Sequence, residues 1–156
     1  MGVSYVVLPL TKDVADWMDQ AGEARPSPLE ASRSPTLREL KAVVEGLEGY
    51  HSRVRASVRL RCVDLDVVAQ GGYRAGWSTT IWAHCLHDKT RHPEDDDVIR
   101  FSFHKGSPEL AVLVLERLSH VCGPFVLYCD GGGPGLAVTP GLEPRRAVEQ
   151  WFSLLE

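Results

Sequence analysis

The residues best suited to chemistry lie in one short segment, HCLHDKTRHPEDDD, which spans residues 84–97. It holds three histidines, one cysteine and an acidic run: His84, Cys85, His87, His92, Glu94, Asp95, Asp96 and Asp97. Imidazole, thiolate and carboxylate groups are all zinc ligands. In an extended strand, however, His84 and Cys85 point to opposite faces, and no second well-spaced pair completes a tetrahedron. We therefore predict no metal and no cofactor, and keep a small metal-dependent hydrolase using His84, His87 and His92 as the alternative function.

Cys85 is also the candidate for nucleophilic catalysis, because a thiol needs a nearby base and an orienting acid, and His87 and Asp88 supply those residue types. No strand–turn–helix elbow presents this thiol, and strand alternation places it on an apolar face with Ile81 and Ala83. The sequence therefore favours a packed cysteine, and we assign no catalytic residue. Without a C-x-x-C pair, we expect all four cysteines to be reduced, small hydrophobic residues: Cys62, Cys85, Cys122 and Cys129.

The glycine run in CDGGGPG, residues 129–135, is the other candidate site, because glycine-rich turns often hold phosphates. A phosphate loop leads from a strand into a helix, so that free N–H groups and the helix dipole converge on the anion. Here the run lies between two short apolar, strand-like segments, and Pro134 removes a donor. The pattern predicts a hairpin turn and no phosphate site.

Arginines alternate with apolar residues from residue 53 onward, which predicts a strand with a polar and an apolar face. After Cys62 the alternation changes phase, and a bulge near Cys62 would keep the apolar side inward. The same alternation in neighbouring strands gathers an exposed set of side chains: Arg55, Arg59, Arg61, Trp82, His84, Arg100 and His104. Arginine and tryptophan are frequent interface anchors, so we predict a partner-binding surface, with Asp64 and Asp66 as ion-pair partners of the arginines. The acidic run Glu94–Asp97 would form a second contact region.

The remaining pattern indicates an α+β fold. Strand-like segments occur at residues 3–8, 53–67, 77–86, 98–104 and on both sides of the glycine run, and helices follow Thr11, Thr36 and Ser107 and close the chain. Thr36 and Glu39 form a capping box, and Ser107-Pro108 begins a helix that Gly123-Pro124 ends. We predict a single domain over residues 1–156, with a mostly antiparallel sheet of five or six strands and helices on one face. Residues 22–35, rich in Pro and Ser, are expected to form a surface loop.

Composition and net charge limit the classes of function expected for this protein. The 156 residues carry a net charge of −4, which argues against direct nucleic-acid binding through bulk positive charge. No apolar run is long enough to cross a membrane, and the first residues lack the pattern of a signal peptide, so we expect a cytoplasmic protein.

One longer stretch resembles a known group of proteins. IRFSFHKGSPELAVLVLERLSHVCGPFVLYCDGGGPGLAV, residues 99–138, has a strand, F-x-K-G, a helix, C-G-P and a glycine-rich hairpin. This layout is similar to small bacterial immunity proteins of contact-dependent and secretion-system toxins. The resemblance implies a cytoplasmic, non-enzymatic protein that neutralises one cognate toxin, such as a nuclease, by tight binding. Whether it also forms a homodimer stays open.

Overall fold

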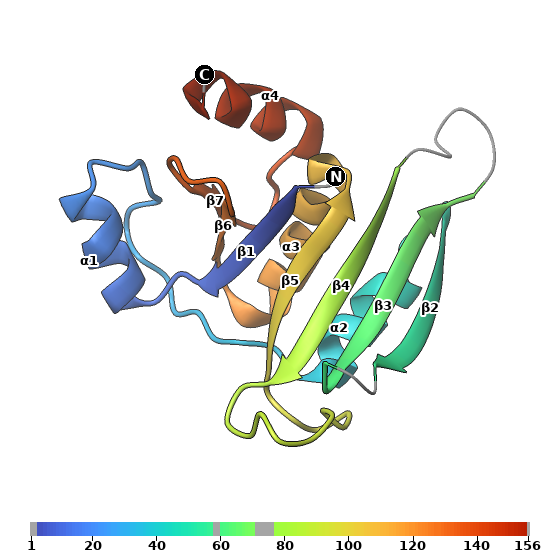
Figure 1. The fold of residues 1–156 in the computed structure, drawn as a ribbon. Helices are drawn as coiled ribbons and strands as arrows, with labels where there is room; N and C mark the ends of the chain where they lie inside the picture. Colours follow the sequence, from blue (N-terminus) through green and yellow to red (C-terminus); the bar gives the residue numbers. More distant parts are fainter. Residues whose placement is uncertain (1–2, 58–59, 71–76, 156) are drawn as a thin grey trace.

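The computed structural model describes residues 3–57, 60–70 and 77–155. Within them the chain forms one seven-stranded sheet and four helices (Figure 1). In chain order the elements are β1 (Ser4–Pro9), α1 (Lys12–Gln20), α2 (Leu37–Glu45), β2 (Tyr50–Ser57), β3 (Cys62–Ala69), β4 (Ser78–Cys85), β5 (Ile99–Gly106), α3 (Pro108–Cys122), β6 (Phe125–Cys129), β7 (Leu136–Val138) and α4 (Pro144–Leu155). The strands lie in the order β2-β3-β4-β5-β1-β6-β7, and each neighbouring pair is antiparallel. The predicted α+β class is confirmed, with slightly more strands than expected.

The main core lies between the sheet and three helices. Side chains from alternate sheet positions, such as Ile81 and Phe103, form one buried cluster with Leu40 of α2, Leu115 of α3 and Trp151 of α4. Strand alternation predicts that Ile99, Phe101 and Phe103 point inward, and all three are buried, as are Ala83 and Cys85. These five side chains lie on the helix-covered face, so the intervening residues must lie on the other one.

A smaller core forms on the opposite face, under α1. Ala15 and Met18 of α1 pack with Val126 and Tyr128 of β6, whose neighbours Phe125 and Leu127 belong to the main core. α1 therefore covers only the β6 end of this second face, while β2 to β5 lie in front of α2 and α3 in Figure 1.

The helix starts follow local capping rules. The Thr36 hydroxyl accepts a hydrogen bond from the Glu39 N–H, and the Glu39 carboxylate accepts one from the Thr36 N–H, which confirms the capping box. Ser107 caps α3 with Pro108 in its first turn, and Gly123 ends it. Helical spacing in α3 predicts one buried stripe of Leu110, Leu113, Val114, Leu118 and Val121, but Val121 is 57% exposed, so its place in this stripe is wrong.

The predicted long strand with a bulge near Cys62 is also wrong. β2 ends at Ser57, and Ser57 is the cross-strand partner of Cys62, so the chain reverses direction between them. The change of phase at Cys62 therefore marks the second strand of a hairpin. As a consequence β2 lies at the edge of the sheet, where Val54 is 43% exposed although we expected it in the core.

The hairpin predicted for the glycine run is confirmed. β6 and β7 pair antiparallel on either side of it, and Gly132 and Gly133 adopt positive φ angles of 97° and 99°. The Trp151 indole N–H donates to the Pro134 carbonyl over 2.8 Å, which ties α4 to this turn. Residues 22–35 contain no helix or strand, in line with the expected loop. Among the described residues, none of the helices has the length and apolar character needed to traverse a lipid bilayer.

Candidate binding face on the open side of the sheet

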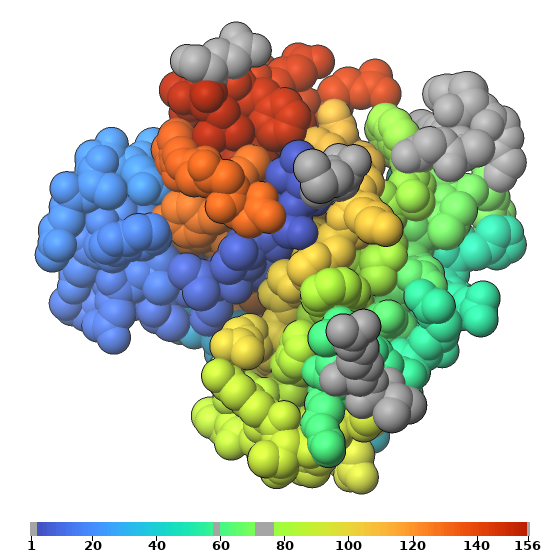
Figure 2. All heavy atoms as spheres, viewed as in Figure 1, coloured from blue at the N-terminus to red at the C-terminus, as the bar shows by residue number. Residues whose placement is uncertain are grey.

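The part of the sheet that faces away from α2 and α3, over β2 to β5, is called the open face here. Its strands form the exposed surface seen in the centre of Figure 2. Cross-strand pairing places Arg55, Asp64, Trp82 and Ser102 in one row of this face, because directly paired residues share a side. The next row contains Arg53, Asp66, Thr80 and His104, and a third pairs His84 with Arg100. Five of the seven predicted surface residues thus share the open face: Arg55, Trp82, His84, Arg100 and His104.

Trp82 and His104 form an aromatic stack on the open face. Their ring centroids are 3.5 Å apart and the rings are inclined by 21°. The His104 Nδ1 hydrogen-bonds to the Ser4 hydroxyl of β1 over 3.0 Å, and its Nε2 to the Ser102 hydroxyl over 2.7 Å. Burial lowers the pKa of His104 below its ordinary value, and so does the neighbouring His84. The imidazole is therefore mainly neutral at pH 7 and is fixed by contacts on both nitrogens.

An ion-pair cluster lies beside this stack. The Arg55 guanidinium lies 2.9 Å from the Asp66 carboxylate and 3.8 Å from that of Asp64. The Thr80 hydroxyl donates to Asp66 over 2.9 Å, and the Cys62 thiol donates to Asp64 over 3.3 Å. The predicted pairing of both aspartates with the arginines is confirmed for Arg55.

Two cationic side chains of the open face are uncompensated. Arg100 and Arg53 are exposed, and neither has a hydrogen-bond or ion-pair partner within the described part of the chain. The pKa of His84 is lowered chiefly by burial and then by the nearby charge of Arg100. The open face therefore offers guanidinium groups next to neutral aromatic rings.

Arg59 and Arg61 do not extend this row of arginines. Arg59 lies outside the described residues. Arg61 precedes β3 with a φ angle of 53°, and its guanidinium donates to the Thr90 carbonyl over 2.7 Å. The physical reason is the end of β2 at Ser57, which removes residue 61 from the strand whose alternation predicted it.

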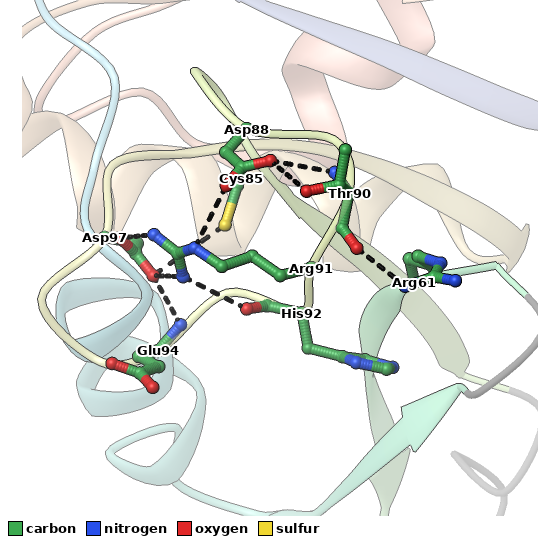
Figure 3. Close-up of polar contacts among 8 residues, drawn as sticks. All are labelled: Arg61, Cys85, Asp88, Thr90, Arg91, His92, Glu94 and Asp97. Carbon is green, nitrogen blue, oxygen red and sulfur yellow. Dashed lines mark hydrogen bonds and ion pairs between the residues drawn. The ribbon is translucent and has the colours of Figure 1, made fainter.

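Cations of the same chain hold the acidic run, and Figure 3 shows the contacts of Arg91 with Asp97 and Asp88. Arg91 makes two hydrogen bonds to Asp97, of 2.6 and 2.8 Å, and its Nε lies 3.3 Å from Asp88. The Arg91 hydrogen bonds and the Glu94 N–H hold the pKa of Asp97 well below its usual range. Asp95 pairs with Lys41 over 2.7 Å, and Asp96 pairs with Arg38, which attaches the loop to α2. Three of the four acidic side chains thus have a structural partner, and Glu94 is exposed.

The three histidines of the alternative hydrolase hypothesis have different surroundings. His84 lies on β4, His87 is exposed after the strand, and the His92 ring hydrogen-bonds over 2.7 Å to the Ser57 carbonyl. Among residues 3–57, 60–70 and 77–155, no three histidine, cysteine, aspartate or glutamate side chains are grouped so that they could hold a metal ion.

The cysteines behave as packing residues. All four thiols are free, and Cys62, Cys85 and Cys122 are buried, as predicted, while Cys129 is partly buried. Burial raises the pKa of Cys62 and of Cys122 to about 11, and it also raises that of Cys85. The Cys85 thiol is therefore protonated at neutral pH and donates to Asp97 over 3.7 Å.

Comparison with known proteins finds no matching family model, no matching curated protein and no matching solved structure. The resemblance to immunity proteins thus stays a prediction from residues 99–138. The sequence did not indicate that Ser4 would contact His104, because nothing local shows that β1 lies beside β5. Thr80 and Ser102 were not singled out either, although the alternation of polar and apolar residues along β4 and β5 places them on the open face.

Proposed function

We propose that this protein is a binding protein of the immunity type, which neutralises a cognate bacterial toxin in the cytoplasm by covering a functional surface of that toxin. The observation that carries this proposal is the Trp82–His104 stack at the centre of a sheet face that none of the described helices covers. Such a face combines an aromatic anchor with exposed guanidinium groups, the residue types that dominate binding energy at protein interfaces.

The rigidity of this face supports the same function. His104 is hydrogen-bonded at both nitrogens and stacked on Trp82, and Arg55 is held by two carboxylates. Side chains that are already ordered lose little conformational freedom when a partner binds. We place the main contact on the open face, since Asp95, Asp96 and Asp97 are engaged within the chain.

The experiment is co-expression with the protein encoded by the adjacent gene, followed by growth assays and calorimetry of the purified pair. We expect the neighbouring product to arrest growth alone, and this protein to bind it and restore growth. Arg100→Ser should weaken the complex by about tenfold or more, as truncating an interface anchor usually does.

Arg146→Ser is the matched control, because Arg146 is an exposed arginine on α4, on the helical side of the sheet. This variant should bind as tightly as the unaltered protein. The proposal is wrong if the protein encoded by the adjacent gene is neither toxic nor bound. Equal binding by both variants would show that Arg100 is not part of the contact.

A further inference from the structure

The edge strand β2 is a second surface with its own chemistry. β2 is eight residues long, as are β3, β4 and β5, and it pairs with β3 in an unbroken register from Tyr50–Ala69 to Ser57–Cys62. It is the terminal strand of the sheet, so its outer backbone edge has no strand partner within the described residues. The opposite edge, β7, is only three residues long.

This edge lacks most of the usual protection against strand addition. Edge strands are commonly blocked by a proline, a bulge or very short length. β2 contains no proline, and its pairing with β3 shows no shift of register. Within the described residues of β2, charged side chains are the protective device that is present, and like charges on an added strand would be repelled.

The two faces of β2 favour different side chains on an added strand. On the open face, Arg53 has no partner within the described part of the chain, and Arg55 is exposed. On the helix side, Val54 is 43% exposed and Ala56 is exposed. β3 already satisfies this pattern from the inner edge, with Asp64 and Asp66 opposite the arginines and Val63 and Leu65 opposite the apolar residues.

A second copy of β2 does not satisfy this pattern. Antiparallel pairing of two β2 strands that keeps the helices on one side brings the arginines of both copies onto the same face. Pairing centred on Val54, for example, sets Arg53 opposite Arg55 of the other copy. Like charges directly opposite each other destabilise a strand pair.

We propose that the β2 edge accepts, by strand addition, an extended segment of a partner protein in which carboxylate and aliphatic side chains alternate as they do in β3. Main-chain hydrogen bonds along β2 supply affinity, and the alternating side chains supply selectivity. A hollow of about 280 Å³ on the open face, bordered by Arg53, Val68 and Thr80, gives space beside the first arginine. This inference does not depend on the toxin partner proposed above, because it concerns the strand edge and is tested without that partner.

The probe is a capped synthetic peptide with the β3 sequence VDLDVVA, and the control peptide is VKLKVVA. Amide exchange and NMR shifts of the full chain are recorded during titration. We expect the acidic peptide to protect amides within Tyr50–Ser57, with a Kd on the order of 0.1–1 mM. The lysine peptide should bind about five- to tenfold more weakly, because it sets cations against Arg53 and Arg55.

Charge reversal supplies the decisive comparison. Arg53→Glu should abolish the preference, because the charged residues of either peptide then face one anion and the remaining cation of Arg55. Arg146→Glu makes the same charge change on α4, away from the edge, and should leave the preference unchanged. Equal binding of both peptides to the unaltered protein, no protection of β2 at about 5 mM peptide, or protection of β7 instead would each overturn the inference. The comparison of the two peptides on the unaltered protein stands even where Arg53→Glu fails to fold.

Discussion

Trp82 and His104 form a diagonal cross-strand pair. The register of β4 and β5 sets Trp82 opposite Ser102 and His104 opposite Thr80, yet the indole stacks on the imidazole two residues away. Diagonal neighbours on one face of a sheet lie within reach of aromatic side chains. The stack therefore buries part of an imidazole on a face that is otherwise open, and this burial has consequences that can be measured.

The first consequence is a dependence of stability on pH. His84 and His104 have folded-state pKa values below the ordinary 6.5, chiefly because of burial. The unfolded chain therefore binds more protons below that value, so the free energy of unfolding falls as the pH decreases from about 7.5 to about 5. Urea unfolding at both pH values measures this loss. Replacing both histidines by glutamine should reduce it.

The second consequence concerns the titration of His104 itself. Trp82→Ala removes the indole that covers the imidazole, so the pKa of His104 should rise toward its ordinary value. NMR titration of the imidazole protons measures the shift. Thr80→Ala is the control, because Thr80 is opposite His104 but donates to Asp66. An unchanged pKa in Trp82→Ala would show that the indole contributes nothing to the burial.

The capping box of α2 provides a test of local stability. Thr36→Ala removes the hydroxyl that accepts from the Glu39 N–H and should lower the free energy of unfolding by about 0.5–2 kcal/mol. Thr36→Ser keeps the acceptor and should cost less. Chemical denaturation of the two variants separates the contribution of the hydroxyl from that of the methyl group.

Glu39 itself has a pKa lowered to about 2, first by hydrogen bonds from Arg33. Its contribution to the free energy of unfolding is therefore lost only as the pH falls from 4.5 toward that value.

The central core residue Phe103 tests the packing between the sheet and the helices. Its side chain is fully buried, and Phe103→Ala should lower the free energy of unfolding by about 3–5 kcal/mol, because it leaves a cavity. Phe152 on α4 is 38% exposed, so Phe152→Ala makes the same chemical change with a clearly smaller loss. Similar losses for both variants in urea unfolding would contradict the assignment of the core.

The elements with strict local patterns were predictable from the sequence. β4 alternates along its length and β5 alternates from Ile99 to His104, and the ends of α3 are marked by Ser107-Pro108 and Gly123-Pro124. For the same reason, alternation alone predicted that four side chains share one face of the sheet: Trp82, His84, Arg100 and His104.

The reversal between β2 and β3 was not predictable in this way. Residues 58–61 continue the alternation and contain no glycine, proline, asparagine or aspartate, the residues that usually mark turns. The sequence also did not predict that the acidic run is attached to α2. Lys41 and Asp95 are separated by 54 positions, and only the tertiary fold brings them within 2.7 Å.

The place of β1 constrains how the chain assembles during synthesis. β1 precedes every other strand, yet it lies inside the sheet, between β5 and β6. The hairpins from β2 to β5 can form in sequence as they leave the ribosome, but β1 finds its first partner only when β5 has been made, and its second only after α3. Until then the apolar side chains of β1 have no neighbouring strand to pack beside. A nascent chain is therefore most prone to bind chaperones or to aggregate before the sheet closes around β1.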